Sequence, residues 1–456
     1  MARKVFISFL GTSNYVECNY FLEEDDSKLI KNVKYVQEAL LKLHQPFFGR
    51  EDICYFFLTK DAKSQNWEDG QQFNSITRNY DLPNEGLKNR IISLCENGFQ
   101  AQIENVEIPE GFSTKDIWAI FQTVFSKLEN NDEVYFDITH AFRSIPMLGL
   151  ALLNYSKAIH NVNVKGIYYG AFEKLGFASE VKKIPLDERN APILNLTTLS
   201  ILQDWSNAAK DFIEFGNTQN LTKTLKSNYN YFDTLSKKQN GRLKNSLTKV
   251  AQGLQDFSTS IATNRGNSII NNDNARLLNK EIQDLRPRLD EVVQLSPFSS
   301  LLSVIENEIK VFEDEDIFNG LIAIKWCIKN KLIQQGITLL QEFIITICLK
   351  KIELDYNNKI NRDTVSGLLG KRQDDLFNYS NNSNTKLEQE IVVNKLEKED
   401  YYQELIPIFD HISNNIRNDI NHAGFARKGK SPEEFEKALV KSFSKFYNLL
   451  NFPNIS

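Results

Sequence analysis

Between residues 4 and 170 the chain alternates short apolar runs with segments of helical spacing, and this alternation limits the possible folds most. Ile53–Leu58 is almost continuously apolar, as expected of a strand that is buried on both faces. Further strands are predicted at 4–10, 106–108, 134–138 and 164–169, and helices at 29–43, 87–95, 113–128 and 145–159. Strands that alternate with helices form a parallel sheet covered on both faces. The predicted fold class of this part is therefore α/β, with a Rossmann-like parallel sheet.

After Leu196 strand patterns disappear, so the rest of the chain is predicted to be all α. Bundle helices are predicted at 301–312, 317–328, 332–352 and 401–421, and Ser431-Pro432-Glu433-Glu434 is typical of a helix start. The closing helix is expected to bury Phe435, Leu439, Phe443 and Phe446. Residues 216–280 are polar and are interpreted as a spacer without a core, and 374–398 as an exposed insertion. Helix breaks are predicted at Arg286-Pro287-Arg288 and at Ser296-Pro297.

Length and composition narrow the class of protein. A chain of 456 residues is expected to form two or three domains. No apolar run is long enough for a membrane span, and the apolar start breaks at Gly11, which favours a first strand over a signal peptide. The five cysteines are scattered without CxxC spacing, which favours a reducing cytoplasm and offers no zinc site. A net charge of −5 argues against a broad basic surface for duplex nucleic acid, although a narrow groove remains allowed.

Three polar loops follow predicted strands, at 11–15, 139–144 and 170–172. Ligands of such sheets bind at the carboxyl ends of the strands, where backbone N–H groups and helix N-termini favour anions. Arg143 can pair with a phosphate there. Hydrogen bonds are offered by Thr12, Ser13, Asn14, Thr139 and His140. The other interpretation is that Asp137 and Thr139 only brace a turn. Gly11 is not part of a GxGxxG pattern, which disfavours a dinucleotide cofactor.

Near the C-terminus, Arg417-Asn418-Asp419-Ile420-Asn421-His422 separates a fixed cation from a titratable imidazole by four residues. On an ideal helix Arg417 and His422 lie about 140° apart, whereas Asn418 and His422 stack at i and i+4 and Asn418 can orient the imidazole. A twofold dimer that pairs this helix with its copy would bring two arginines and two histidines into one cleft. An imidazole moves protons and a guanidinium stabilises a phosphorane, so this set suits RNA cleavage by the 2′-hydroxyl without a metal. The alternative is ordinary surface ion pairs, with His422 placed near a helix C-terminus.

Together, these two motifs resemble the CARF–HEPN ribonucleases of type III CRISPR systems. Residues 137–144, with 11–15 upstream, resemble the nucleotide-binding CARF domain. The stretch 417–422, followed by Gly424, resembles the HEPN signature of Arg, four to six residues, then His. The resemblance covers roughly residues 1–185 and 300–456. It implies a CARF sensor at 1–185, a helical linker at 186–300 and a HEPN helical ribonuclease domain at 301–456.

The resemblance also implies the partners and the residue roles. It implies a homodimer or higher even oligomer whose CARF pair binds a cyclic oligoadenylate as activator, with cyclic tetra-adenylate expected in preference to hexa-adenylate. The implied substrate is single-stranded RNA, cut in the cytoplasm to 2′,3′-cyclic phosphate and 5′-hydroxyl ends in antiviral defence, with no cofactor, metal or membrane. Arg417 and His422 are then catalytic, and Asn418 supports them. The implied ligand residues are Gly11, Thr12, Ser13, Asn14, Asp137, Thr139, His140, Arg143 and Ser144. Asp137 is expected to brace the loop, because its charge would repel an anionic ligand.

Three other interpretations remain open. The first is a ligand-responsive DNA-binding transcriptional regulator that keeps the CARF sensor and reads DNA with helices in 196–300. No helix-turn-helix pattern stands out there. A metal-dependent nuclease would use carboxylates such as Glu306 and Glu308 near Lys310. A non-catalytic helical interaction protein would be insensitive to His422→Ala. The sequence gives neither the ring size of the activator nor the RNA base preference, and some CARF domains also cleave their own activator, a step in which His140 or Ser13 could take part.

Overall fold

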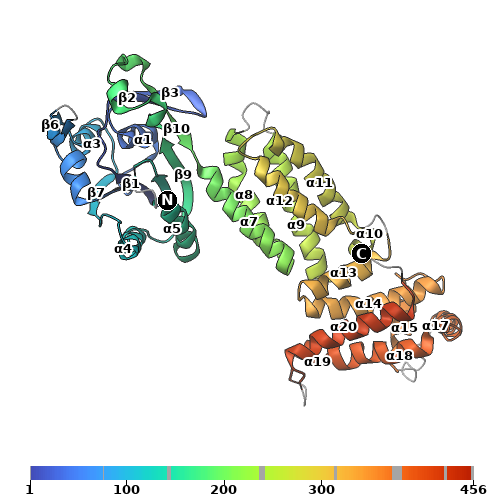
Figure 1. Cartoon of the computed structure of the whole chain (residues 1–456). Coiled ribbons are helices and arrows are strands. Elements are labelled where there is room, and N and C mark those ends of the chain that lie inside the picture. Colours follow the sequence, from blue (N-terminus) through green and yellow to red (C-terminus); the bar gives the residue numbers. More distant parts are fainter. Residues whose placement is uncertain are drawn as a thin grey trace. The chain divides into compact units, whose positions relative to one another are not determined.

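The computed structural model describes residues 2–74, 77–140, 145–235, 242–312, 316–371, 383–425 and 429–452. The chain divides into two compact units, Met1–Gln203 and Asp204–Ser456 (Figure 1). Each unit has its own arrangement of elements and its own core, and each is described by itself. No helix among the described residues is long and apolar enough to cross a membrane.

The first unit is built on an eight-stranded sheet of order β3-β2-β10-β9-β8-β1-β4-β7 (Figure 1). Its strands are β1 (Lys4–Leu10), β2 (Cys18–Leu22), β3 (Asp25–Val33), β4 (Ile53–Leu58), β7 (Gln102–Glu107), β8 (Glu133–Asp137), β9 (Asn163–Gly170) and β10 (Asn190–Asn195). The five strands β9, β8, β1, β4 and β7 are parallel. A separate hairpin joins β5 (Gly70–Asn74) to β6 (Asn79–Asn84).

Helices cover both faces of this sheet, as the alternation of strands and helices predicts. Side chains alternate along each strand, so Phe6 and Phe56 pack on one face and Val5 and Phe57 on the other. The first face is covered by α1 (Val36–His44) and α3 (Leu87–Glu96), and the second by α4 (Thr114–Phe125) and α5 (Ile145–His160). Shorter helical segments are η1 (Gln45–Phe47), α2 (Lys60–Ala62), η2 (Lys63–Trp67), η3 (Phe172–Leu175), α6 (Ala178–Val181) and η4 (Leu186–Glu188).

The prediction of a helix over 29–43 is wrong in its first part. Leu29 and Ile30 belong to β3 and pair with Phe21 and Tyr20 of β2, and the helix begins only at Val36. Their spacing fits either a strand or a helix, and the pairing with β2, which lies earlier in the chain, decides between them. Strand β10, which the sequence does not predict, pairs with both β9 and β2 and so extends the sheet past residue 185.

The second unit is helical. Its elements are α7 (Thr197–Phe215, which begins in the first unit), α8 (Gln219–Leu235), α9 (Arg242–Ala262), α10 (Gly266–Asn271), α11 (Asp273–Asp290), α12 (Ser296–Ile309), α13 (Asn319–Lys329), α14 (Ile333–Lys351), α15 (Lys359–Leu369), α17 (Ser383–Leu396), α18 (Tyr402–Asp410), the π-helical segment η6 (His411–Arg417), α19 (Asn418–Asn421) and α20 (Pro432–Leu449). Of the expected exposed insertion at 374–398, residues 374–382 lie outside the described residues, and Val392 and Leu396 of α17 are buried.

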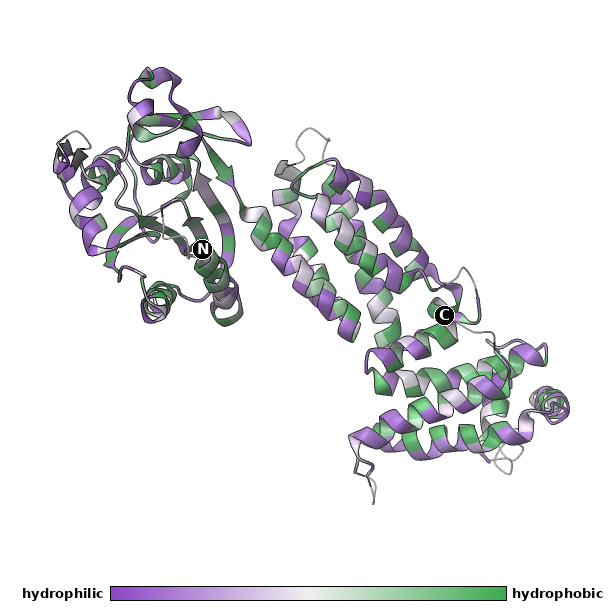
Figure 2. Ribbon diagram, viewed as in Figure 1, coloured by the Kyte–Doolittle hydropathy of each residue, from purple (hydrophilic) through white to green (hydrophobic). Residues whose placement is uncertain are grey.

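Residues 216–280 are not a spacer without a core, so that interpretation is wrong. The rings of Trp205, Phe232 and Phe298 are fully buried, and all three pairs of rings are in contact with centroids 4.7–5.7 Å apart. The polar residues lie on the outer sides of amphipathic helices, and Figure 2 shows green stripes along α7, α8, α9 and α11 between purple faces. The break predicted at Pro287 is also wrong, because α11 continues through it, with Leu285 and Leu289 buried on either side.

Helices α13, α14 and α20 form the core of the last part of the unit. Phe343 of α14 meets Phe446 of α20 edge to face, with ring centroids 6.3 Å apart. The predicted start of α20 is confirmed by a capping box, in which Ser431 and Glu434 each bind the other's backbone N–H. Phe446 and Leu439 are buried as expected, whereas Phe435 is only partly buried. This packing fixes α14 under the segment that carries Arg417.

Candidate functional site

At the carboxyl end of β8, Asp137 forms a buried brace. Its carboxylate accepts hydrogen bonds from the Ser8 hydroxyl (2.7 Å), the Thr139 backbone N–H (2.9 Å) and the Thr139 hydroxyl (2.5 Å). The Thr139 hydroxyl in turn accepts from the Gly170 N–H at 2.8 Å, which ties β8 to β9. Burial raises the pKa of Asp137 to about 6, although these hydrogen bonds act in the opposite direction. The carboxylate is therefore occupied within the protein, as expected for a bracing residue.

The loop after β1 is held from beneath by Asn66. This fully buried amide donates to the Gly11 carbonyl at 2.9 Å and to the Ser13 carbonyl at 3.0 Å. The Gly11 N–H donates to the Tyr15 hydroxyl at 3.1 Å, which closes the loop on itself. Thr12 and Ser13 are exposed, whereas Asn14 is half-buried. The loop is thus fixed in shape and keeps its Thr12 and Ser13 side chains available to a ligand.

The two loops border a cavity of about 440 Å³ over the ends of the parallel strands. Of the predicted ligand residues it is lined by Gly11, Thr12, Ser13, Thr139 and His140, whereas Asn14 and Asp137 do not line it. Arg143 and Ser144 lie outside the described residues. The sequence did not single out Thr59, Asp61, Glu110 and Phe112, which also line the cavity. These residues follow β4 and β7, so the rule that ligands bind at strand ends could have indicated them.

His140 is a half-buried titratable group of this cavity. Its ring meets the Tyr15 ring edge to face at 4.6 Å, and its Nε2 is buried without a hydrogen-bond partner among the residues the structure describes. Burial lowers the pKa of His140 to about 4, so the ring is neutral at physiological pH. A neutral imidazole can donate or accept one hydrogen bond at Nε2, depending on its tautomer.

At the other candidate site, Arg417 ends the π-helical segment η6 and α19 follows it directly. The guanidinium is half-buried, and its Nη1 donates to the Gln341 amide oxygen of α14 at 3.2 Å. A π segment inserts extra residues into a helix and is frequent at functional sites, because it re-aims the side chains that follow. This bond uses one of the five guanidinium N–H donors, and no other described residue accepts a hydrogen bond from the rest.

His422 caps the C-terminal end of α19 and is exposed. Its backbone N–H donates to the Asn418 carbonyl at 3.0 Å, so the expected i to i+4 relation of these two residues holds in the backbone. Within the described part of the chain no hydrogen bond joins the Asn418 amide to the imidazole. The chain turns away after His422, with positive φ at Ala423 and Gly424. The imidazole therefore faces solvent beside the end of the helix.

Asp419, between these two residues, is a structural anchor rather than a surface ion-pair partner. It is buried, and its Oδ2 accepts from the Lys430 backbone N–H at 2.8 Å, which closes the turn between α19 and α20. Glu306 and Glu308 of α12 form ion pairs with Arg286 and Lys329, as in an ordinary solvated face. Among the residues that the structure describes, no group of three or more His, Cys, Asp or Glu is placed to hold a metal ion.

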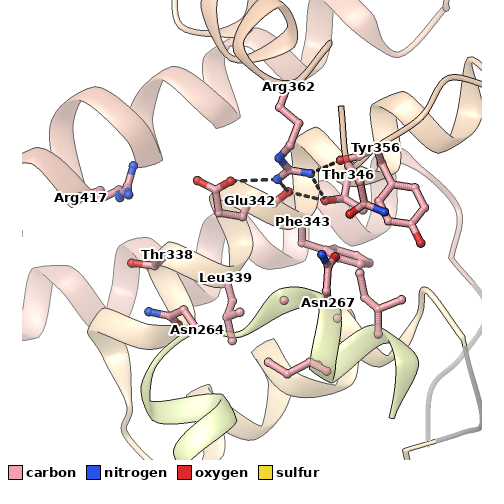
Figure 3. A pocket seen from close by; sticks show the side chains of 15 residues that line it. Asn264, Asn267, Thr338, Leu339, Glu342, Phe343, Thr346, Tyr356, Arg362 and Arg417 are labelled. Carbon is pink, nitrogen blue, oxygen red and sulfur yellow. Dashed lines mark hydrogen bonds and ion pairs between the residues drawn. The ribbon is translucent and has the colours of Figure 1, made fainter. Parts of the chain in front are cut away.

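Arg417 also lines a pocket of about 380 Å³ in the second unit (Figure 3). Its walls come from α10, α13, α14 and α15, and include Asn267, Thr338, Glu342 and Arg362. Arg362 is fully engaged there, since it donates to Glu342 Oε2 (2.9 Å), Thr346 Oγ1 (2.9 Å) and the Tyr356 carbonyl (2.8 Å). Arg417, with its single bond to Gln341, is the less engaged of the two guanidinium groups at this pocket.

Comparisons with known proteins agree with this division of the chain. Residues 5–173 match the family model described as the CARF domain of the CRISPR system endoribonuclease Csx1, and residues 201–315 match the second domain of CRISPR-associated protein MJ1674. The MJ1674 protein of Methanocaldococcus jannaschii is 26% identical over 357 residues, which cover 76% of this chain and 47% of that protein. The chain therefore spans about half the length of this curated relative.

Proposed function

The chain is a CARF-containing ancillary protein of the type III CRISPR kind, and on that premise we propose that it is an RNA endonuclease controlled by a cyclic oligoadenylate. The observation that carries the proposal is that Arg417 and His422 lie at the two ends of one short helix, α19. Among the described residues only Gln341 binds the Arg417 guanidinium, and the imidazole is exposed. A cation that binds phosphate and a side chain that moves protons are what metal-independent RNA cleavage requires.

In this proposal the 2′-hydroxyl of the RNA attacks the adjacent phosphorus. The imidazole of one His422 takes the hydroxyl proton while the new 2′-O–P bond forms, and the bond from phosphorus to the 5′-oxygen breaks. The leaving 5′-oxygen takes a proton from the imidazolium of a second copy of His422, so the products carry a 2′,3′-cyclic phosphate and a 5′-hydroxyl. The Arg417 guanidinium stabilises the charge that builds up on the phosphorane oxygens. Asn418, adjacent to Arg417 and exposed, is proposed to contact the RNA or the imidazole once substrate is bound.

We propose that the active form is a dimer or a higher even oligomer. One protomer supplies one imidazole, whereas the reaction needs a group that removes a proton and a group that delivers one. Two copies of the 417–422 segment related by a twofold axis supply both, together with two guanidinium groups. We propose that residues 301–456, which carry this segment, form the HEPN domain.

The activator is proposed to bind at the carboxyl edge of the sheet. The described lining of the cavity contains Asp61 and Glu110 and no lysine or arginine. An adenine amino group or a ribose hydroxyl suits these carboxylates, which would repel the phosphates of the ligand. Cyclic tetra-adenylate is proposed in preference to hexa-adenylate. Binding would bias the second unit toward its active pairing, which is a coupling between two separate sites.

The test is cleavage of a quenched fluorescent single-stranded RNA in chelator, with and without cyclic tetra- and hexa-adenylate. The variant is His422→Ala, and the matched control is His411→Ala, an exposed histidine eleven residues earlier. We expect cutting that needs the activator and that persists in chelator and in the His411→Ala variant. Cutting should be lost in the His422→Ala variant and on RNA with a 2′-deoxy residue at the cut. Cutting that chelator abolishes, or that His422→Ala retains, would overturn the proposal.

A further inference from the structure

The pocket beside Arg417 has the features of a subsite for part of the substrate. It is bounded on one side by α10 and on the other by α14 and α15, and Arg417 lies at its border (Figure 3). Its apolar wall is formed by buried Ile269, Ile270 and Leu339. A group that enters it therefore meets an apolar surface while it remains next to the guanidinium that the proposed mechanism places on the phosphate.

Two acceptor oxygens of the pocket are not used by the described residues. Glu342 Oε2 pairs with Arg362, whereas Oε1 accepts no hydrogen bond from a described residue. Asn264 Oδ1 is buried at the wall and has no partner among the described residues. A carboxylate accepts and never donates, so the complementary ligand group carries N–H or O–H donors. Asn267 and Thr338 add side chains that can donate or accept.

We propose that this pocket holds one base of the RNA strand, next to the phosphate that Arg417 contacts, and that it favours a base with an exocyclic amino group. The proposal rests on the ribonuclease function proposed above and adds a base preference to it. The amino group of adenine, cytosine or guanine has two N–H donors for Glu342 Oε1 and Asn264 Oδ1, whereas the Watson–Crick edge of uracil has only its single N3–H. Proteins that read single-stranded RNA splay bases out and bind their edges, which is what an apolar pocket with a few acceptors allows.

The placement of α10 supports this assignment independently of the 417–422 motif. Helix α10 lies within the segment that matches the second domain of MJ1674, outside the part of the chain that carries Arg417. It nevertheless contributes Asn267 and the apolar Ile269 and Ile270 to the pocket. The middle of the chain thereby takes part in substrate binding, in addition to forming its own core.

The first test fills the pocket without touching the catalytic pair. Asn267→Trp places a large ring in the pocket, and Asn271→Trp, an exposed position on the same helix that does not line it, is the matched control. On single-stranded RNA with one cleavable position we expect Asn267→Trp to lower kcat/KM at the preferred base about tenfold or more and Asn271→Trp to leave it unchanged. Equal kcat/KM in the wild type and both variants would overturn the proposal.

The second test changes the acceptor. Glu342→Gln replaces one acceptor oxygen by an amino donor and leaves Arg362 its Thr346 and carbonyl partners. We expect the ranking of the four bases at the cut to shift toward uracil, whose carbonyl oxygens accept from an amide. Wild-type ranking in the variant, or a wild type that prefers uracil, contradicts the proposal.

A third measurement separates failure of the subsite from failure of the ribonuclease. Uncleavable 2′-deoxy oligonucleotides of each base are titrated against the wild type, Asn267→Trp and Asn271→Trp by fluorescence anisotropy. We expect the wild type and Asn271→Trp to bind amino-bearing bases more tightly than uracil, and Asn267→Trp to lose the difference. An inactive wild type that shows this pattern refutes only the catalysis, and an active one without it refutes the subsite.

Discussion

Replacing Asp137 by Asn is expected to change how the stability of the first unit depends on pH. Its carboxyl is fully buried, and its pKa is raised from 3.8 to about 6. Two pKa units correspond to about 3 kcal/mol, the cost of ionising this group in the folded relative to the unfolded state. Because the folded-state pKa is raised, the contribution of the protonated Asp137 carboxyl to the free energy of unfolding is fully present below pH 3.8. This contribution is lost as the pH rises through about 6. Roughly 2 kcal/mol of this loss falls between pH 4.5 and 7.5.

The assay is urea unfolding of the full chain, followed by hydrogen–deuterium exchange of peptides from β1 and β8, at those two pH values. Between pH 4.5 and 7.5, the free energy of unfolding of the Asn variant should fall by about 2 kcal/mol less than that of the wild type. Comparing the two proteins cancels the contributions of His44 and His140, whose lowered pKa values of about 4 act in the opposite direction. Thr139→Val removes a hydrogen bond that lowers the Asp137 pKa. The stability of this variant should therefore depend on pH more strongly than that of the wild type. Equal pH dependence in the wild type and Asp137→Asn would refute the reasoning.

Two further substitutions test the packing of the second unit. Trp205→Ala empties the centre of the core formed by α7, α8 and α12 and should lower the free energy of unfolding by about 3–5 kcal/mol. The control is Trp118→Ala, at a mostly exposed ring on α4 of the first unit, which should change the free energy of unfolding by about 0.5 kcal/mol or less. Similar effects of the two substitutions would contradict the assigned core. Ser431→Ala breaks the capping box of α20 and should cost about 1 kcal/mol, measured by urea unfolding, and an unchanged midpoint would show that the cap is not stabilising.

The central strands of the sheet could be predicted because burial on both faces leaves a clear signal. Ile53–Leu58 is buried at every position, so its sequence is apolar throughout. Strand β3 could not be predicted in the same way, because it pairs only with β2 and its residues are mainly polar. Strand β10 contains Pro192, which argues against a strand in sequence alone. Such strands are specified by their partners rather than by their own composition.

The error over residues 216–280 has a different cause. Asn, Ser, Lys and Thr dominate the composition there, but apolar residues such as Leu247, Leu254 and Phe257 recur every three or four positions and are buried. Helical spacing of apolar residues is compatible with a polar mean composition, so composition alone does not indicate whether such helices form a core. Pro287 does not end α11, because the packing of Leu285 and Leu289 holds the helix together where an isolated helix would break.

The candidate sites also contain residues that the sequence predicts and residues that it does not predict. The loop ends at Thr12, Ser13, Thr139 and His140 lie at one cavity, as the strand-end rule predicts for a parallel sheet. The bracing role of Asn66 was not predictable, because it reaches the Gly11 loop from a segment 55 residues away. Neither was the pocket at Arg417, whose walls come from four helices that meet only through tertiary packing. Short motifs indicate chemistry, whereas the residues that surround them depend on the whole fold.

The most direct test of the account is the rate of RNA cleavage in chelator as cyclic tetra-adenylate is titrated. It compares the wild type with Ser13→Trp, which fills the cavity of the first unit, and with His422→Ala. The account predicts that Ser13→Trp needs more activator for the same maximal rate, and that His422→Ala binds the activator normally but does not cut. Cleavage that ignores the activator, or an unchanged midpoint in Ser13→Trp together with cutting by His422→Ala, would contradict a sensor in one unit that controls catalysis in the other.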